Sequence, residues 1–303
     1  MSKVVCIYHN ADPDGIFSGA IVLNNHPDAV MIGYNYEAEV QHIIDECAGA
    51  LVYMVDISFD DWGKMQELCD VSEKFIWIDH HITAFEKYRN TSLVVNSKFH
   101  CHFSNENLGA CIGVWKYFYS SLVPLCINLV AQYDTWQSYG SDYWNTYILP
   151  FRYASGMMKD PKEALETYYN FRYPMCEDVA HIELKKGRAI AQYIESQNEI
   201  LAHSKLCFNA SFVSFTKGIY HVLVVNMSLM GDMFKSRDMS GYDFTVGFMY
   251  NKSEGWKISL RSTGKDIDLG EIAKQYGGGG HKNAAGFKVA TYQELKQILP
   301  YLK

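Results

Sequence analysis

The chain has 303 residues, of which 48% are hydrophobic and 20% charged, with 22 glycines and 7 prolines. This globular composition excludes disordered, collagen-like and low-complexity chains, and the length favours two domains. The charges, 27 basic against 34 acidic, exclude a general positive field for long duplex DNA. A polyanionic partner must therefore meet a local cluster of side chains or bound cations, which favours small anions.

The cysteines and apolar stretches bear on cellular location. Eight cysteines are scattered through apolar runs without a Cys-x-x-Cys pair, which favours buried, reduced thiols over a disulfide framework. The apolar run near the N-terminus is too short for a secretory signal. The longest uncharged stretch, 117–133, carries Pro124 and several polar residues, which argues against a membrane span. We expect a cytoplasmic monomer or homodimer without a membrane partner.

In the first third of the chain, short apolar runs alternate with helical patterns. Strands are predicted at 4–8, 30–34, 51–55 and 75–78, and helices at 16–23, 37–47 and from about residue 60. This alternation predicts βαβ units in an α/β fold with a doubly wound, mostly parallel sheet. Ligands of such sheets bind beyond the carboxyl ends of the strands, so the residues that follow the strands are the first site candidates.

The rest of the chain contains a helical region and a smaller set of strands. Helical spacing covers 108–133 with a break at Pro124, signals are weak over 139–174, and a long helix is predicted over 177–203. Strands are predicted at 208–214, 219–225, 244–250 and 256–261, followed by a helix at 268–276, a four-glycine loop and a helix from Thr291. We expect a first domain with a helical extension at 1–176, a connecting helix at 177–205 and a smaller mixed α/β domain at 206–303.

Acidic and imidazole side chains follow the predicted strands and one helix of the first domain. They are His9, Asp12, Asp14, Asp56, Asp79, His80, His81 and Asp134. Carboxylates this close raise one another's pKa unless cations neutralise them. Aspartate and histidine together suit divalent ions, Mn²⁺ foremost, with Mg²⁺ or Co²⁺ as alternatives. The ligands suffice for two ions, a pair that activates water and holds a phosphoryl group for in-line displacement.

Each of these residues also has a plain structural interpretation. An aspartate after a strand is often a helix N-cap, and Asp12 or Asp56 taken alone fits that role. A histidine in a loop is more often a surface residue than a ligand. Several independent caps, however, would not be expected to share one sheet edge and the ligand types of one metal class. The pattern as a whole therefore favours a metal site.

A second group of candidates lies near the C-terminus. Four glycines at 277–280 precede His281, and such a run lets successive backbone N–H groups turn towards an anion. Arg261, at the end of a predicted strand, offers the bidentate fork that phosphate recognition favours. A flexible turn and a solvated arginine are the alternative interpretation of the same residues.

The ordered set HNADPDG, VDIS, IDHH and YDTW, followed by SLRS and GGGGHKNAAGF, resembles the DHH phosphoesterase superfamily with a C-terminal DHHA1 domain. The compact length and the YDTW element resemble its nanoRNase-like and oligoribonuclease-like members. The resemblance implies a two-metal, Mn²⁺-dependent 3′-5′ exonuclease for short oligonucleotides, with its active-site cleft between the two domains. Alternatives are hydrolysis of 3′-phosphoadenosine 5′-phosphate, dinucleotides or polyphosphate, or a non-catalytic nucleotide-binding protein.

The resemblance also implies a role for each candidate residue. One ion would be held by His9, Asp12 and Asp56, and the other by Asp14, Asp56, His80 and Asp134, with Asp56 as the bridge. The catalytic group would comprise His81, Asp79, Arg261 and His281, in which His81 faces the substrate phosphate and Asp79 orients its neighbours. Substrate phosphate would also contact Gly278, Gly279 and Gly280.

Overall fold

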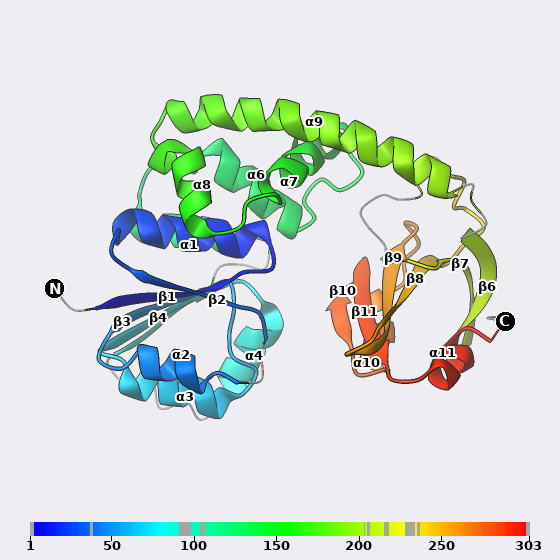
Figure 1. Cartoon of the computed structure of the whole chain (residues 1–303), viewed down its shortest axis with the longest axis horizontal. Coiled ribbons are helices and arrows are strands. Elements are labelled where there is room, and N and C mark those ends of the chain that lie inside the picture. Colours follow the sequence, from blue (N-terminus) through cyan, green and yellow to red (C-terminus); the bar gives the residue numbers. More distant parts are fainter. Residues whose placement is uncertain are drawn as a thin grey trace. The chain divides into compact units, whose positions relative to one another are not determined.

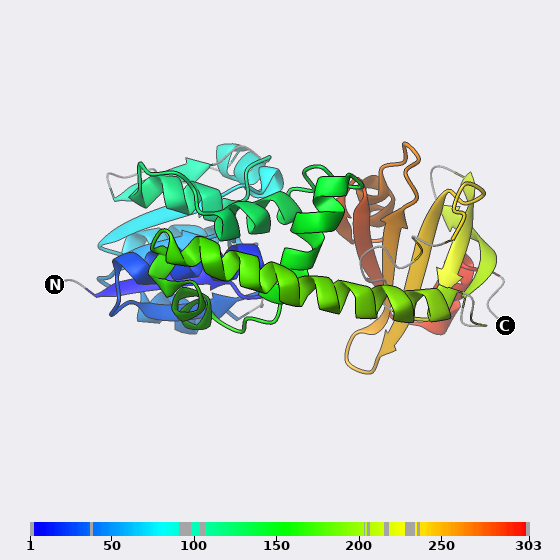
Figure 2. The same cartoon turned by 90° about the horizontal axis from the view of Figure 1, so that it is seen from above.

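The computed structural model describes residues 3–36, 39–90, 98–103, 107–202, 204, 207–214, 218–227, 234 and 237–300. The chain divides into two compact units, Met1–Ala191 and Gln192–Lys303. The helix α9 (Met175–Ala202) runs across the boundary as one uninterrupted element (Figures 1 and 2). The division into domains at 1–176, 177–205 and 206–303, and the cleft between them, stay predictions.

Within the described residues, a five-stranded parallel sheet forms the centre of the first unit, in the order β2-β1-β3-β4-β5. Its strands are β1 (Val4–His9), β2 (Val30–Tyr34), β3 (Leu51–Val55), β4 (Lys74–Asp79) and β5 (Phe99–Phe103). Cys6 and Tyr8 of β1 pack into one core, and Val5 and Ile7 pack into another on the opposite face. Burial on both faces explains the continuous apolar runs of these strands, and the predicted α/β fold class is confirmed.

Helices cover both faces of this sheet (Figure 1). One face carries α1 (Pro13–Asn25), α5 (Ala110–Phe118), α6 (Leu125–Asp134), η1 (Trp144–Ile148), α7 (Leu149–Ser155), α8 (Pro161–Thr167) and η2 (Tyr169–Phe171). The other carries α2 (Gln41–Glu46), α3 (Trp62–Val71) and α4 (Ile82–Asn90). The break at Pro124 between α5 and α6 is confirmed, because Pro124 immediately precedes the first turn of α6.

Three elements of the first unit differ from the sequence-based expectation. The helix α2 is shorter than the predicted 37–47, and α4 was not predicted. The strand β5 was also missed, because its apolar residues alternate with His100 and His102 instead of forming a continuous run. Such alternation is typical of a strand with one exposed face, which agrees with the place of β5 at the sheet edge.

A mixed six-stranded sheet forms the second unit, as far as its residues are described, in the order β10-β11-β9-β8-β7-β6. The strands are β6 (Cys207–Ser214), β7 (Gly218–Val225), β8 (Phe244–Asn251), β9 (Gly255–Ser262), β10 (Gly279–His281) and β11 (Ala284–Val289). One face packs against α10 (Leu269–Lys274) and α11 (Tyr292–Ile298). The predicted four-glycine loop is in part wrong, since Gly279 and Gly280 pair with β11 through backbone groups that need no side chain.

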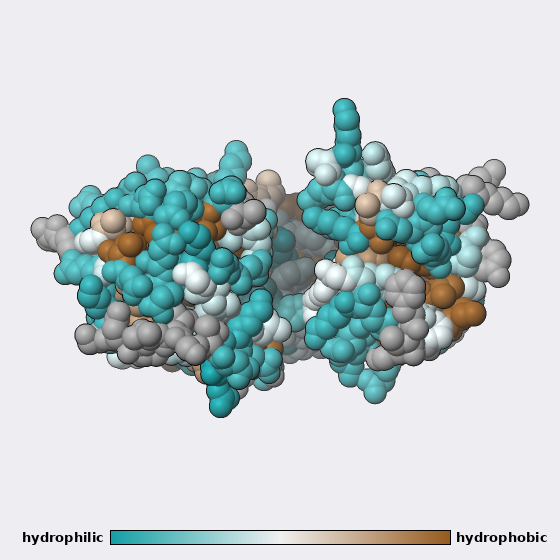
Figure 3. Space-filling model, turned by 90° about the horizontal axis from the view of Figure 1, so that it is seen from below, coloured by the Kyte–Doolittle hydropathy of each residue, from teal (hydrophilic) through white to brown (hydrophobic). Residues whose placement is uncertain are grey.

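Three features bear on the predictions about membranes and disulfides. Among the described helices, none combines the length and the hydropathy that a bilayer crossing requires. The face in Figure 3 is largely hydrophilic, with limited apolar areas. All eight cysteines are free, and six of them are buried.

Candidate metal centre and phosphate-binding residues

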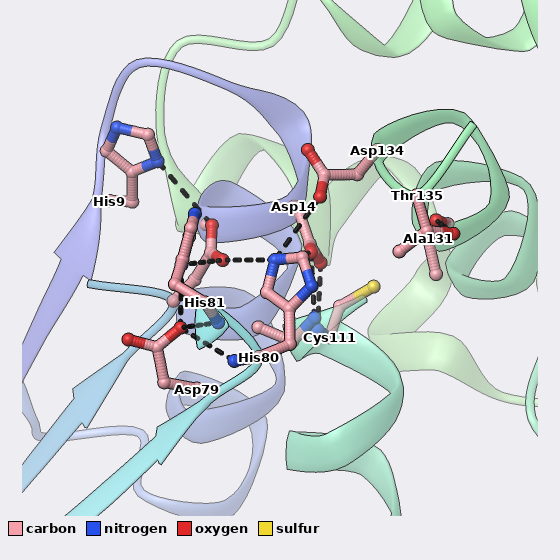
Figure 4. Close-up of polar contacts among 12 residues, drawn as sticks. His9, Asp14, Asp79, His80, His81, Cys111, Ala131, Asp134 and Thr135 are labelled. Carbon is pink, nitrogen blue, oxygen red and sulfur yellow. Dashed lines mark hydrogen bonds and ion pairs between the residues drawn. The ribbon is translucent and has the colours of Figure 1, made fainter. Parts of the chain in front are cut away.

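The predicted metal ligands gather at the carboxyl edge of the parallel sheet (Figure 4). The strands β1, β3 and β4 are neighbours in the sheet, so the residues at their ends meet there. Three groups of ligand atoms, each within 4.8 Å of one another, are formed by His9, Asp12 and Asp56, by Asp14, His80 and Asp134, and by Asp56, His80 and His81. The structure thus brings together all six predicted ligands and His81.

Asp12 has both of the roles that the sequence left open. Its Oδ1 accepts a hydrogen bond from the backbone N–H of Gly15 at 3.0 Å and so caps α1, with Pro13 in the first helical position. Its Oδ2 lies 2.9 Å from Nδ1 of His9. The helix cap therefore fixes the carboxylate and leaves its second oxygen directed at the cluster.

Asp56 lies between two of the ligand groups. Its Oδ2 is 3.5 Å from Nδ1 of His9, and its Oδ1 is 3.4 Å from Nε2 of His80. The residue is buried and has a positive φ of 60°, and the next helix, α3, is capped by Asp61 instead. The N-cap interpretation therefore fails for Asp56, and its two oxygens face in the two directions that a bridging carboxylate requires.

Asp14 is held by the N-terminus of α5. Its Oδ1 and Oδ2 accept hydrogen bonds, both of 2.8 Å, from the backbone N–H groups of Cys111 and Ala110. The positive end of a helix dipole stabilises a carboxylate in this position. Oδ2 also lies 3.7 Å from Nε2 of His80. Sequence reasoning missed this contact, because the partners are 96 and 97 residues apart and contribute only backbone atoms.

Gly109, the residue before α5, leaves room for Asp14. A Cβ at this position would lie 2.8 Å from Oδ2 of Asp14 and 2.8 Å from Cα of Ala131 in α6, the helix that ends at Asp134. We expect Gly109→Ala to destabilise the fold by about 1–3 kcal/mol and to weaken Mn²⁺ binding, as measured by denaturation and calorimetry. The matched control is Gly241→Ala, where a Cβ meets no atom within 4 Å. Unchanged Mn²⁺ affinity would contradict the assignment of Asp14 as a ligand.

Asp79 orients the His80-His81 pair. Its Oδ1 accepts hydrogen bonds from the backbone N–H groups of His80 and His81 and lies 2.7 Å from Nδ1 of His81. Burial opposes the charged imidazole, but the hydrogen bond and the charge of Asp79 raise the pKa of His81 to about 9. A protonated His81 that donates to Asp79 through Nδ1 keeps its Nε2–H for another acceptor.

The carboxylates of the cluster raise the pKa values of two of its histidines. Burial acts against the charge of His9, yet the carboxylates of Asp12 and Asp56 beside its Nδ1 raise its pKa to about 11. Burial likewise opposes the charge of His80, but the nearby carboxylates of Asp56 and Asp14 raise its pKa to about 10. In each case the neighbouring carboxylates attract a positive charge into the cluster.

The pKa values of two carboxyl groups in the cluster are also raised. Burial, with the charge of Asp56 added to it, raises the pKa of Asp14 to about 6. Burial and the charge of Asp14 raise the pKa of Asp134 to about 7. Like charges in a buried place thus favour proton binding, and bound cations would compete with those protons.

Two buried polar atoms without hydrogen-bond partners also favour a metal site in this cluster. Oδ1 of Asp56 and Nε2 of His80 are buried and make no hydrogen bond to the described part of the chain, although they lie 3.4 Å apart. Buried polar atoms of this kind need a partner. Oxygen and imidazole ligands without thiolate are typical of Mn²⁺ and related ions. The donor set therefore fits a centre for divalent cations.

The second unit places Arg261 and His281 on one face of its sheet. Arg261 pairs with Ala284 across β9 and β11, and Ala284 pairs with His281 across β11 and β10. Residues paired in this way have side chains on the same face. The neighbours of Arg261 and Ala284, Leu260 and Ala285, belong to the core that packs against α10 and α11, so Arg261 and His281 lie on the opposite face.

The glycines before His281 have structural tasks of their own. The N–H groups of Gly277 and Gly278 donate to the carbonyls of Lys274 and Ala273 at the end of α10, and so do not turn towards an anion here. A Cβ on Gly278 would lie 2.1 Å from the carbonyl oxygen of Gly286, and nothing lies within 4 Å of one on Gly279. Close packing on β11 explains why residue 278 is a glycine. Substrate binding by Gly278, Gly279 and Gly280 stays a proposal.

Comparison with known proteins relates the second unit to a family and the whole chain to several individual proteins. Residues 220–303 match the DHHA1 domain family. The uncharacterized protein R106 of Acanthamoeba polyphaga mimivirus is 25% identical over 99% of this chain and 70% of its own length. The pGpG-specific phosphodiesterase PggH of Vibrio cholerae is 10% identical, with a TM-score of 0.49 over 98% of this chain and 96% of its own. RecJ of Thermus thermophilus, solved with Mn²⁺, is 17% identical, with a TM-score of 0.49 over 95% of this chain and 50% of its own.

The DHHA1 match confirms the predicted identity of the C-terminal domain. In the first unit, the residues of the HNADPDG, VDIS, IDHH and YDTW motifs converge on one candidate metal centre, as the resemblance implied. Residues 220–303 thus match the DHHA1 family, and the first unit carries a candidate centre for divalent cations.

Proposed function

We propose that the chain is a Mn²⁺-dependent phosphodiesterase that hydrolyses short oligonucleotides as a nanoRNase-like 3′-5′ exonuclease, with two ions in its centre. The position of Asp56 carries this proposal. Its two oxygens lie 3.5 Å from His9 and 3.4 Å from His80, each towards a different group of ligands. A carboxylate that faces two ligand groups in this way can join two cations.

Each residue then has a task that follows from its contacts. His9, Asp12 and Asp56 would hold one ion, and Asp14, Asp56, His80 and Asp134 the other. When bound, the ions favour deprotonation of water and offset the charge that develops on the phosphate. His81, oriented by Asp79, can donate its Nε2–H to a phosphate oxygen of the substrate. Asp14 stays fixed by the N-terminus of α5, which keeps the centre rigid.

A panel of substrates tests the proposal. The chain with Mn²⁺ is assayed in parallel against pGpG, a 5-mer, 3′-phosphoadenosine 5′-phosphate and polyphosphate, and we expect the two oligonucleotides to be turned over fastest. A clear preference for the bisphosphate or for polyphosphate would replace the proposed substrate class. Tight binding of all four without turnover would contradict an enzyme and favour a nucleotide-binding protein.

Arg261 is expected to bind a substrate phosphate. Arg261→Ala should raise KM by about tenfold or more, because a charge-assisted hydrogen bond contributes about 1.5–3 kcal/mol. Arg261→Lys should restore the affinity only in part, since an ammonium group lacks the planar fork. Calorimetric titration should show unchanged Mn²⁺ affinity in both variants. Unchanged kinetics, or a loss of Mn²⁺ affinity, would contradict this role.

A further inference from the structure

A separate pocket of about 850 Å³ lies in the first unit. Its walls come from the C-terminal parts of α1 and α5, the first part of α6 and the segment from η2 into α9. The predicted metal and substrate residues are absent from its walls. On α1, Asp14 is ten residues before the pocket residue Asn24, which is about 15 Å along a helix. The pocket thus lies at the other end of α1 from the metal ligands.

Aromatic side chains form much of the pocket wall. Trp115, Tyr119, Phe171 and Tyr173 line it. The rings of Trp115 and Tyr119 have centroids 4.3 Å apart, and Phe171 meets Trp115 edge-on at 6.1 Å. Pockets of this size with mainly apolar walls and a few polar groups are typical of small-molecule sites. Rings of this kind favour a flat aromatic ligand.

The backbone beside the pocket is strained. Tyr169, Asn170 and Phe171 have φ values of 47°, 53° and 55°, a left-handed conformation that side chains disfavour. Asn170 and Phe171 both line the pocket. Phe171 is held there by packing against Phe17 and Trp115. Strain of this kind is retained where the surroundings enforce it and is frequent at ligand sites.

The charges in the wall favour an anionic ligand. Arg172 lines the pocket, and its guanidinium makes no ion pair or hydrogen bond with the part of the chain that the structure describes. The carboxylate of Glu177 also lines it, but its Oε1 accepts a hydrogen bond from the backbone N–H of Leu125, at the start of α6. Glu177 is therefore engaged by a helix N-terminus, and Arg172 is available to a ligand.

We propose that this pocket binds a small molecule that combines linked or fused aromatic rings with one anionic group. Arg172 pairs with the anion, and Trp115 and Phe171 contact the rings. The site is separate from the metal centre and independent of the proposed phosphodiesterase activity.

Two fluorescent probes that differ in one charged group test the proposal. They are 8-anilinonaphthalene-1-sulfonate and its neutral analogue N-phenyl-1-naphthylamine, titrated into the full chain with Mn²⁺ present. We expect one sulfonate to bind per chain, about tenfold more tightly than the amine, as one charge-assisted contact provides. Arg172→Met should abolish this difference without affecting the amine, and the exposed Lys162→Met is the matched control.

Two results would overturn the proposal: equal affinity of the two probes for the wild-type chain, or sulfonate binding that Arg172→Met leaves unchanged. Because Arg172 is exposed, its variant is expected to fold, which circular dichroism checks. The titration is repeated with Asp56→Asn. Sulfonate binding should persist there whether or not phosphodiesterase activity is lost, so the two proposals fail independently.

Discussion

Asp56→Asn is expected to lower turnover by about a thousandfold or more, which corresponds to about 4 kcal/mol of activation free energy. The substitution removes a negative charge from a residue that faces both His9 and His80, and barely changes the side-chain volume. The lost charge weakens both proposed metal positions. The remaining ligands at one position therefore cannot compensate for the loss at the other. Turnover is measured with a short oligonucleotide and saturating Mn²⁺.

The control for this variant is Asp60→Asn, the same chemical change four residues along the chain on an exposed side chain. It should leave turnover unchanged. Thermal unfolding of both variants should show a retained fold. Turnover of Asp56→Asn within about tenfold of wild type, or about 1.4 kcal/mol, would contradict the bridging role of Asp56.

Substrates of two to five nucleotides should show a kcat/KM on the order of a hundredfold higher than a 25-mer, about 2.7 kcal/mol in the transition state. The net charge of −7 provides no general attraction for a long phosphate backbone. Affinity should instead come from the metal centre and from Arg261 and His281, which meet only a few phosphates.

The 25-mer in this comparison carries the same 3′-terminal sequence as the short substrates, so that only length differs. Asp56→Asn serves as the blank for contaminating nucleases. Equal efficiency on both lengths would contradict the preference and would indicate additional contacts along the strand. A weak dependence of kcat/KM on salt should accompany the preference for short substrates.

The strands and the gathering of the metal ligands could be predicted because both depend on local patterns. Buried parallel strands give continuous apolar runs, and the rule for their carboxyl ends places His9, Asp56 and Asp79 at one edge. The alternative roles of Asp12 and Asp56 could not be separated in this way. Asp12 caps α1 and Asp56 caps no helix, a difference that only the backbone conformation shows.

Features that depend on distant backbone groups could not be predicted. The N–H groups of Ala110 and Cys111 that hold Asp14 come from a helix about a hundred residues away, and backbone donors leave no motif in a sequence. The pairing of β10 with β11 was missed for the same reason, since Gly279 and Gly280 pair without side chains. The strained turn at Tyr169–Phe171 has only a weak signature, because Asn170 alone among its residues is of a type that adopts positive φ readily.

The number of Mn²⁺ ions that the chain binds tests the central claim most directly. Isothermal titration of the metal-free chain, with anomalous scattering from Mn²⁺-soaked crystals, gives both the stoichiometry and the positions. We predict two ions in the wild-type chain, on either side of the Asp56 carboxylate, and fewer than two in Asp56→Asn. A single ion in the wild-type chain, or two ions that Asp56 does not join, would contradict the two-metal centre.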